Sequence, residues 1–290
     1  MRKITGKLTL VWTIIFSLLL TMSFNAAAFS APAAKKVPAK KVLKIEPEVV
    51  LATTTSTQDS GLLDVMIPAF EKKWNKKVKV KVIAVGTGQA IQLGKDGNAD
   101  VILVHSKKSE DEFVAQGYGF KAYDVMYNQY LIVGPTNDPA NIAGAKTALE
   151  AFTKIAEAKG KFISRGDDSG THKKEVSIWG KAKIKPEGNW YLSAGQGMGE
   201  TLRMADEMGA YTLVDEATFL TNKTSLKNLS QGDKELFNQY GIIQVKSTKK
   251  PVAANELIWH FISPQGQKTI KDFGKNKYGK SIFVPNAKKR

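Results

Sequence analysis

The sequence has no cysteine among its 290 residues. Disulfide bonds and thiolate metal sites are therefore excluded, and stability has to come from packing. Only three histidines are present, His105, His172 and His260, and their positions show no metal-ligand spacing. The chain also lacks a P-loop, and the glycines at 195–199 do not form the G-x-G-x-x-G pattern. We therefore expect neither a bound metal ion nor a nucleotide cofactor.

Residues 1–28 have the pattern of a secretory signal peptide. They combine a basic start, an apolar stretch from Leu8 to Phe24 and small residues at Ala26–Ala28 that are typical of a cleavage site. An uncleaved anchor is the alternative, since the apolar stretch approaches the roughly 20 residues of a membrane helix. Hydroxyl residues dilute that stretch, and no cysteine follows it to carry lipid. We therefore expect a free protein in the periplasm, without a lipid anchor.

The basic charge of the chain is concentrated near its start. Residues 29–45 are rich in Ala, Pro and Lys without apolar periodicity, which predicts a solvated linker. Eight of the 43 basic residues and none of the 27 acidic ones precede Glu46, so +8 of the net charge of +16 remains for the rest. No nucleic-acid motif accompanies this mild excess, and we expect anionic partners but no nucleic acid.

Apolar segments with strand and helix periodicity alternate from residue 46 onward, which predicts an α/β protein with a largely parallel, covered sheet. Predicted strands include 49–52, 77–85, 100–104, 130–134, 210–214 and 241–245. We expect two α/β lobes joined by two crossover strands. Residues 46–128 and 246–290 would form lobe I, and residues 129–245 would form lobe II.

Three polar turns, Thr53–Thr57, Gly86–Gln89 and Ser164–Thr171, stand between a predicted strand and a predicted helix. Ligands of α/β proteins bind at such places, where helix N-termini present free N–H groups. The turns are rich in hydroxyls and glycines, and only the third carries an ionic donor, Arg165. Such a set of donors suits a small anion with several oxygens.

Each of these features also has a purely structural interpretation. A serine or threonine before a helix usually caps it, and Thr57 or Ser60 could do so here. Arg165 could form an ion pair with Asp167 or Asp168 that stiffens the loop, and such a pair could equally orient its other edge towards a ligand.

The histidines leave similar alternatives open. Ser169 and His172 suggest a nucleophile and a base, but neighbours at a helix start rarely face each other and no G-x-S-x-G elbow is present. His105, which follows a predicted strand, is as compatible with packing as with a site.

Several motifs resemble the periplasmic tungstate-binding proteins of ABC transporters. The resemblance is collinear from Val49 to Phe273, and it rests on the segments TTTS at 53–56, 83–105, FISRGDDSGTHKKE at 162–175, 189–202 and 210–213. It implies a type II periplasmic binding protein, with the ligand cleft between the two lobes. It also implies tungstate as ligand, with molybdate as the alternative, an ABC permease in the inner membrane as partner, a monomer and no enzymatic activity.

The resemblance assigns oxyanion contacts to eight residues of this chain, namely Thr54, Thr55, Ser56, Thr87, Gly88, Arg165, Ser169 and Thr171. One position departs from the family pattern. Glu216 follows Asp215 where a basic residue is frequent, so closure or capture would differ if this position lines the rim.

Other functions remain open on the residues alone. A receptor for molybdate, vanadate or phosphate would have the same fold. Hydrogen phosphate carries a proton and needs an acceptor, whereas tungstate, molybdate and sulfate need only donors. Asp59, Asp167 and Asp168 are candidate acceptors for this proton, so phosphate remains an alternative ligand until the orientation of these side chains is known. Alternatives of other classes are a secreted Ser-dependent hydrolase and a polyanion-binding surface protein, which would show a steep salt dependence.

Overall fold

The structure is a computed structural model that describes residues 44–288, all of which belong to one compact unit. The predicted signal peptide and nearly all of the predicted linker lie outside the described residues. No helix within residues 44–288 combines the length and the apolar character needed to cross a bilayer.

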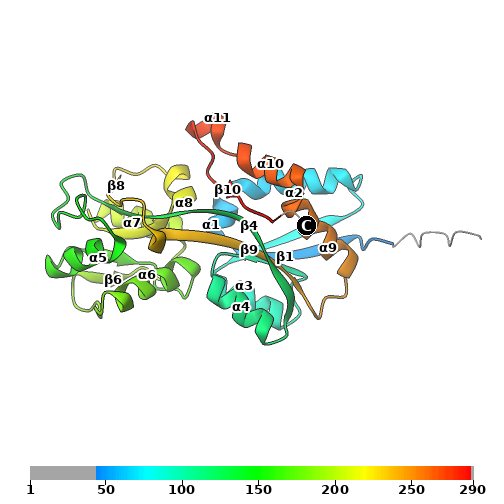
Figure 1. The fold of residues 1–290 in the computed structure, drawn as a ribbon, viewed down its shortest axis with the longest axis horizontal. Coiled ribbons are helices and arrows are strands. Elements are labelled where there is room, and N and C mark those ends of the chain that lie inside the picture. The colour runs from blue at the N-terminus through cyan, green and yellow to red at the C-terminus, as the bar shows by residue number, and fades with distance from the viewer. Residues whose placement is uncertain (1–43, 289–290) are drawn as a thin grey trace, which may run out of the picture. The chain divides into compact units, whose positions relative to one another are not determined.

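Strands and helices alternate along most of the described chain (Figure 1). The strands are β1 (Glu48–Thr54), β2 (Lys79–Val85), β3 (Val101–Val104), β4 (Gly119–Gly134), β5 (Phe162–Ser164), β6 (Tyr191–Ser193), β7 (Thr212–Asp215), β8 (Lys227–Asn228), β9 (Phe237–Val245) and β10 (Val284–Pro285). The helices are α1 (Thr55–Asp59), α2 (Leu62–Lys73), α3 (Thr87–Lys95), α4 (Lys107–Ala115), α5 (Ala148–Glu157), α6 (Gly170–Lys181), α7 (Met198–Glu207), α8 (Glu216–Thr221), the 3₁₀-helix η1 (Lys234–Leu236), α9 (Pro251–Ile262), α10 (Pro264–Asp272) and α11 (Lys275–Tyr278).

The main sheet has the order β10-β4-β9-β3-β1-β2. β1 pairs in parallel with β2 and β3, whereas β9 pairs antiparallel with both β3 and β4. The prediction of a largely parallel sheet is therefore wrong. Alternating strands and helices give parallel pairs where each helix returns the chain to the end of the sheet at which the previous strand began. The long strands β4 and β9 instead pair with each other in opposite directions.

The 16-residue strand β4 connects the two sheet regions of the fold. Its first part pairs with β9 and β10, and its last part pairs with β7 and β8. Register shifts between Gly119 and Ala122 and between Asp124 and Met126 bend it on the way. The sequence predicted only residues 130–134, because the earlier part is broken by polar residues that the partly exposed strand accommodates.

Four hydrophobic clusters divide the described residues into two lobes. The first lobe consists of β1–β3, β9, β10, the first part of β4, α1–α4 and α9–α11. Two of the clusters form its core, and Ala217 of α8 is the one member that comes from the second lobe. The second lobe contains β5–β8, α5–α8, η1 and the last part of β4, with the other two clusters. The lobe boundaries predicted at 128/129 and 245/246 stay a prediction, and Gly241–Val245 pair with strands of the first lobe.

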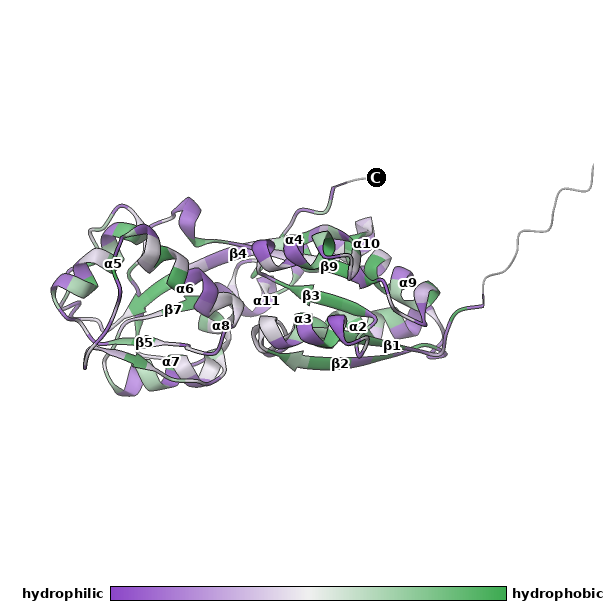
Figure 2. Cartoon of the chain, turned by 90° about the horizontal axis from the view of Figure 1, so that it is seen from below, coloured by the Kyte–Doolittle hydropathy of each residue, from purple (hydrophilic) through white to green (hydrophobic). Residues whose placement is uncertain are grey.

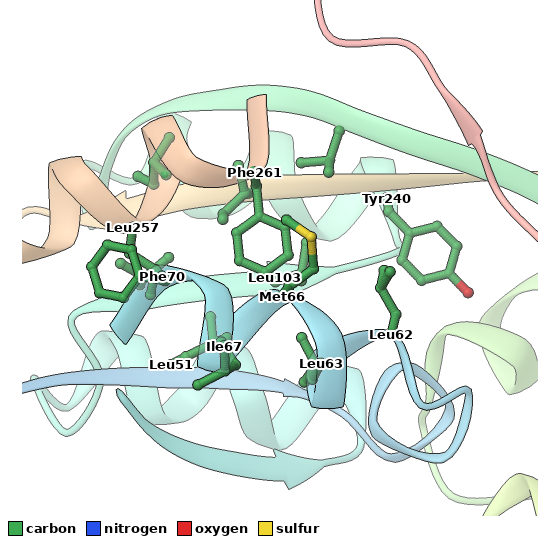
Figure 3. Close-up of a cluster of buried hydrophobic side chains, with 14 of the residues drawn as sticks. Leu51, Leu62, Leu63, Met66, Ile67, Phe70, Leu103, Tyr240, Leu257 and Phe261 are labelled. Carbon is green, nitrogen blue, oxygen red and sulfur yellow. The ribbon is translucent and has the colours of Figure 1, made fainter. Parts of the chain in front are cut away.

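The first lobe shows how these clusters form. In Figure 3, Met66 and Phe70 of α2 meet Leu257 and Phe261 of α9 above the strand residue Leu51. These five side chains are fully buried, and each large apolar side chain removed from water contributes about 1.5–3 kcal/mol. Figure 2 shows the strands of both lobes as the most hydrophobic ribbons, between helices with hydrophilic outer faces. The sheets are therefore rigid supports for the turns at their ends.

Candidate oxyanion site

The β1–α1 junction holds four consecutive hydroxyl residues, and the structure gives them different tasks. Thr53 Oγ1 donates to the Leu103 carbonyl oxygen at 2.7 Å and so ties β1 to β3. Thr54 is the N-cap of α1, because its hydroxyl accepts from the Thr57 N–H at 3.3 Å. Thr57 lies inside α1 and caps no helix, whereas the hydroxyl of Ser60 accepts from the Leu62 N–H at the start of α2 at 3.2 Å.

Ser56 links this junction to the end of β3. It is fully buried, and its Oγ lies 3.2 Å from Thr54 Oγ1 and 3.3 Å from His105 Nε2. Neither contact is needed to cap α1, so Ser56 remains available for another task.

The second polar turn starts α3 and touches the other lobe. Thr87 is fully buried, and its Oγ1 accepts from the Gly170 N–H at 3.1 Å. A Cβ atom added at Gly88 would lie 2.7 Å from Asp168 Oδ2. Glycine at 88 therefore permits the close approach of α3 to the loop before α6.

Arg165 is the only charged donor of the three turns, and it is 2% exposed. Its Nε donates to Asp167 Oδ2 at 2.9 Å, and its Nη2 donates to Thr55 Oγ1 at 3.1 Å. Its Nη1 is buried and has no hydrogen-bond partner among residues 44–288. Asp167 thus braces one edge of the guanidinium, while Asp168 pairs with Lys173 instead, at 3.1 Å.

The start of α6 supplies the last two predicted residues. Ser169 caps the helix, since its Oγ accepts from the His172 N–H at 3.2 Å. Thr171 is fully buried, and its Oγ1 has no hydrogen-bond partner within the described part of the chain. The His172 ring Nδ1 accepts from the Asp168 N–H at 3.0 Å, so the imidazole is engaged by the loop backbone.

Contacts between the lobes connect the three turns. Arg165 of the second lobe reaches Thr55 of the first, and Thr87 of the first lobe reaches Gly170 of the second. A Cβ atom at Gly170 would lie only 2.9 Å from the His105 ring, which itself contacts Ser56. These contacts link seven of the eight predicted residues directly or through a neighbouring residue, and Thr171 follows Gly170 in the chain. We call the eight residues and their contacts the oxyanion site.

His105 is part of this network, although the sequence left its role undecided. It is 5% exposed, and its Nδ1 lies 2.9 Å from the Tyr130 hydroxyl and 3.0 Å from Asn238 Oδ1. Burial, and to a lesser extent the charge of Arg165, lowers the pKa of His105 to about 4, so the imidazole is neutral at pH 7. Its position directly after β3 is the signal that could have placed it in the site, because the polar turns follow strands in the same way.

The departure at Glu216 has a structural counterpart. Glu216 starts α8 in the second lobe, and its carboxylate forms an ion pair of 2.6 Å with Lys280 from the segment between α11 and β10. The preceding Asp215 is fully buried and caps α8 through the Thr218 N–H at 2.9 Å. Burial raises the pKa of Asp215, which its hydrogen bonds partly oppose.

A groove of about 940 Å³ adjoins the oxyanion site and shares His105 and Gly170 with it. We call it the lysine groove. Its basic residues are Lys107, Lys108, Lys173, Lys174 and Lys234, and its acidic ones are Glu112, Asp124 and Asp168. The groove therefore carries an excess of positive charge beside the buried site.

The donors of the oxyanion site define the chemistry that it can perform. Two buried donors, Arg165 Nη1 and Thr171 Oγ1, have no acceptor among the residues that the structure describes, and a buried donor without an acceptor costs about 1–3 kcal/mol. A ligand that brings several oxygen acceptors would satisfy both. Asp167 offers no free edge to such a ligand, because its oxygens accept from Arg165 Nε and from the Ser169 N–H.

Comparisons with known proteins agree with these features. The model of the PBP superfamily domain matches residues 30–267. A tungstate-binding protein, TupA, of Peptoclostridium acidaminophilum is 48% identical over 285 residues, which cover 95% of this chain and 99% of the relative. The structure is similar to that of the tungstate ABC transporter from Geobacter sulfurreducens, with a TM-score of 0.71, 53% identity and coverage of 79% of this chain and 100% of the other. It is also similar to the tungstate-binding protein TupA from Desulfovibrio alaskensis, with a TM-score of 0.67, 40% identity and coverage of 84% and 100%.

Proposed function

Because the chain belongs to the PBP superfamily, among the relatives of tungstate-binding proteins of ABC transporters, we propose that it captures tungstate and delivers it to an ABC importer. The observation that carries the proposal is the pair of buried, unpartnered donors, Arg165 Nη1 and Thr171 Oγ1, within the oxyanion site. The ligand would be held by the eight predicted residues, Thr54, Thr55, Ser56, Thr87, Gly88, Arg165, Ser169 and Thr171.

Binding would replace the hydration of a dianion by protein donors. Losing that hydration is costly, and each hydrogen bond to a charged group returns about 1.5–3 kcal/mol. About six such bonds would outweigh the cost of lobe closure and reach nanomolar affinity, roughly 12 kcal/mol. Most of the donors are neutral hydroxyl and N–H groups, which allows the ligand to leave again at the permease.

The carboxylates near the site favour an anion without a proton. Hydrogen phosphate needs an acceptor for its proton. Each Asp167 oxygen already accepts one hydrogen bond, Asp168 pairs with Lys173 and is largely exposed, and the exposed Asp59 lies within the electrostatic reach of Arg165. Tungstate and molybdate meet donors only, which supports them over phosphate, and the named relatives support tungstate.

The cellular setting follows from the same proposal. Residues 1–28 would direct export, residues 29–45 would link the folded part to the new N-terminus, and a monomer would work in the periplasm with an inner-membrane permease. Residues 46–128 and 246–290 would move as one lobe against residues 129–245, opening and closing around the ligand.

Isothermal titration calorimetry of the protein with tungstate, molybdate, vanadate, sulfate and phosphate tests the proposed function. We expect the tightest binding with tungstate, and for phosphate we expect a dissociation constant in the millimolar range or weaker. If another of the five anions binds most tightly, that anion and not tungstate is the ligand of the receptor. A heat signal that is the same for all five would refute an oxyanion receptor altogether.

A further inference from the structure

His105 is not one of the eight residues proposed to contact the oxyanion, but its ring is hydrogen-bonded to one of them. Its Nε2 faces Ser56 Oγ at 3.3 Å. Its Nδ1 faces two groups at once, the Tyr130 hydroxyl at 2.9 Å and Asn238 Oδ1 at 3.0 Å. All four residues are buried, and His105, Tyr130 and Asn238 also line the lysine groove.

Asn238 turns its oxygen towards the imidazole for a clear reason. Its Nδ2 donates to Asn128 Oδ1 at 2.8 Å and to the Tyr240 hydroxyl at 3.3 Å. The remaining amide oxygen is an acceptor that needs a donor, and His105 Nδ1 is within reach. The Tyr130 hydroxyl, in contrast, can either donate or accept.

A neutral imidazole carries one N–H, so the same atomic positions allow two arrangements of protons. In the first, His105 Nδ1–H donates to Asn238 Oδ1, and Nε2 accepts the proton of the Ser56 hydroxyl. In the second, the Tyr130 O–H donates to Nδ1, and Nε2–H donates to Ser56 Oγ.

The two arrangements differ in what Ser56 offers to a ligand. In the first arrangement its only proton is committed to His105, and Ser56 can only accept from a ligand. In the second its proton is free to be donated to an oxyanion. The chain from Tyr130 through His105 to Ser56 then points in one direction, and hydrogen bonds in such a chain strengthen one another.

We propose that His105 is a positioning residue whose proton moves from Nδ1 to Nε2 when an unprotonated oxyanion binds, so that Ser56 becomes a donor to the ligand. This inference rests on the proposed function, since it requires that oxyanions bind next to Ser56. The exchange moves one proton between the ring nitrogens, the Tyr130 hydroxyl turns its proton towards Nδ1, and the net charge of the site stays the same. Asn238 Oδ1 loses its donor in this step, and the new hydrogen bond from Ser56 to the ligand has to offset that loss.

The two arrangements also differ in the anions that they suit. A hydrogen phosphate ion could donate its own proton to Ser56 Oγ in the first arrangement, whereas tungstate, with acceptors only, requires the second. The neutral state that both arrangements need is secured by burial and by the charge of Arg165, which together keep the pKa of His105 at about 4.

Nitrogen-15 NMR of the imidazoles tests the exchange directly in the wild-type protein. The chain has three histidines, and His172→Gln and His260→Gln assign their own signals, so that the remaining one belongs to His105. We expect the His105 signals of the free protein to show the Nδ1–H tautomer and those with saturating tungstate to show Nε2–H.

A matched pair of variants tests the role of the Tyr130 hydroxyl. Both Tyr130 and Tyr240 are buried against His105, but only the Tyr130 hydroxyl contacts a ring nitrogen, while Tyr240 stacks on the ring at 4.9 Å. Tyr130→Phe should hold His105 as Nδ1–H and weaken tungstate binding at least about tenfold, equal to about 1.4 kcal/mol. Tyr240→Phe removes the longer of the two hydrogen bonds of Asn238 Nδ2, at 3.3 Å, and leaves the bond to Asn128 at 2.8 Å to hold the amide. This variant should therefore change the tungstate affinity less than about threefold and preserve the tautomer exchange.

The outcomes separate this inference from the proposed function. If tungstate binds and His105 keeps one tautomer throughout, the inference is overturned and the receptor function stands. If Tyr130→Phe and Tyr240→Phe weaken binding equally while the NMR signals do not move, a packing role replaces the positioning role. If no oxyanion binds at all, both proposals fall.

Discussion

The oxyanion site and the lysine groove lie side by side and handle charge in opposite ways. The site has one guanidinium, 2% exposed, among neutral hydroxyls, whereas the groove has five lysines around a volume of about 940 Å³ that water can enter. A charge interaction is strong where water is excluded and weak where solvent and salt screen it. The comparison therefore teaches that affinity should depend on the site, while the groove should affect mainly how fast an anion arrives.

The largest expected effect comes from removing the single buried charge. Arg165→Ala should weaken tungstate binding by about 3–4 kcal/mol, because it deletes a charged donor and leaves the dianion without a counter-charge. Calorimetry measures this loss, and Arg203→Ala is the matched control, since Arg203 is more than half exposed and pairs with Glu200 on the surface.

Arg165 also braces its loop through Asp167, so stability has to be measured beside affinity. Urea unfolding should show a smaller loss for Arg165→Ala than the loss in binding. A variant that unfolds strongly without ligand, or that binds tungstate as the wild type does, would leave Arg165 as a loop brace only.

The next effect concerns His105, which borders both regions. Its pKa is lowered to about 4 by burial, whereas an unfolded histidine titrates near 6.5, so between these values the unfolded chain binds more protons. The His105 contribution to the free energy of unfolding should therefore fall as the pH falls from about 6.5 to 4, by up to roughly 1.4 kcal/mol per pH unit. Urea unfolding at several pH values measures it as the difference between the wild type and His105→Gln. Parallel pH profiles of the two proteins would contradict a buried, neutral His105.

A smaller effect is expected from Thr171→Val, which removes the unpartnered buried hydroxyl. The variant should bind tungstate about tenfold more weakly, while the ligand-free protein should become slightly more stable or stay unchanged, because no hydrogen bond is lost. Thr212→Val is the matched control. Its hydroxyl donates to the Ile163 carbonyl oxygen at 2.7 Å, so this variant should lose about 1 kcal/mol of stability and keep its affinity. Thermal unfolding and calorimetry together check both, and a destabilised Thr171→Val with normal affinity would remove Thr171 from the site.

The smallest equilibrium effect is expected in the groove. Lys174 lies over the Tyr130 ring, 5.9 Å from its centroid, and burial lowers its pKa. Lys174→Gln should slow tungstate association several-fold at low salt and change the equilibrium affinity less than about threefold. Stopped-flow fluorescence at increasing salt checks this, with the exposed Lys185→Gln as control. A large loss of affinity with an unchanged association rate would place Lys174 inside the binding site instead.

Many of the strands and turns that build the oxyanion site could be predicted from local sequence. The apolar runs at 49–52, 100–104 and 130–134 lie in strands of the structure, and glycines and hydroxyls mark the turns that follow. The first part of β4 was not predicted, because its alternation is broken by bulges, and pairing with β9 and β10 decides that it is a strand. Thr54 was not predicted as the cap of α1, because that role depends on β1 ending at this residue.

The amino-acid sequence by itself determined which groups are available: three turns full of hydroxyl and N–H donors, one arginine among them, and neither cysteine nor metal-ligand spacing. Only the tertiary structure decided that Arg165 keeps Nη1 unpaired while Asp167 holds Nε, and that His105 stands between Ser56 and Asn238. The reason is physical. Donor chemistry is a property of each residue, but burial and partnership arise between strand–helix turns that are far apart in the chain, such as those of Thr55 and Arg165, which are 110 residues apart. The crossing strands β4 and β9 bring together the two lobes that carry these turns.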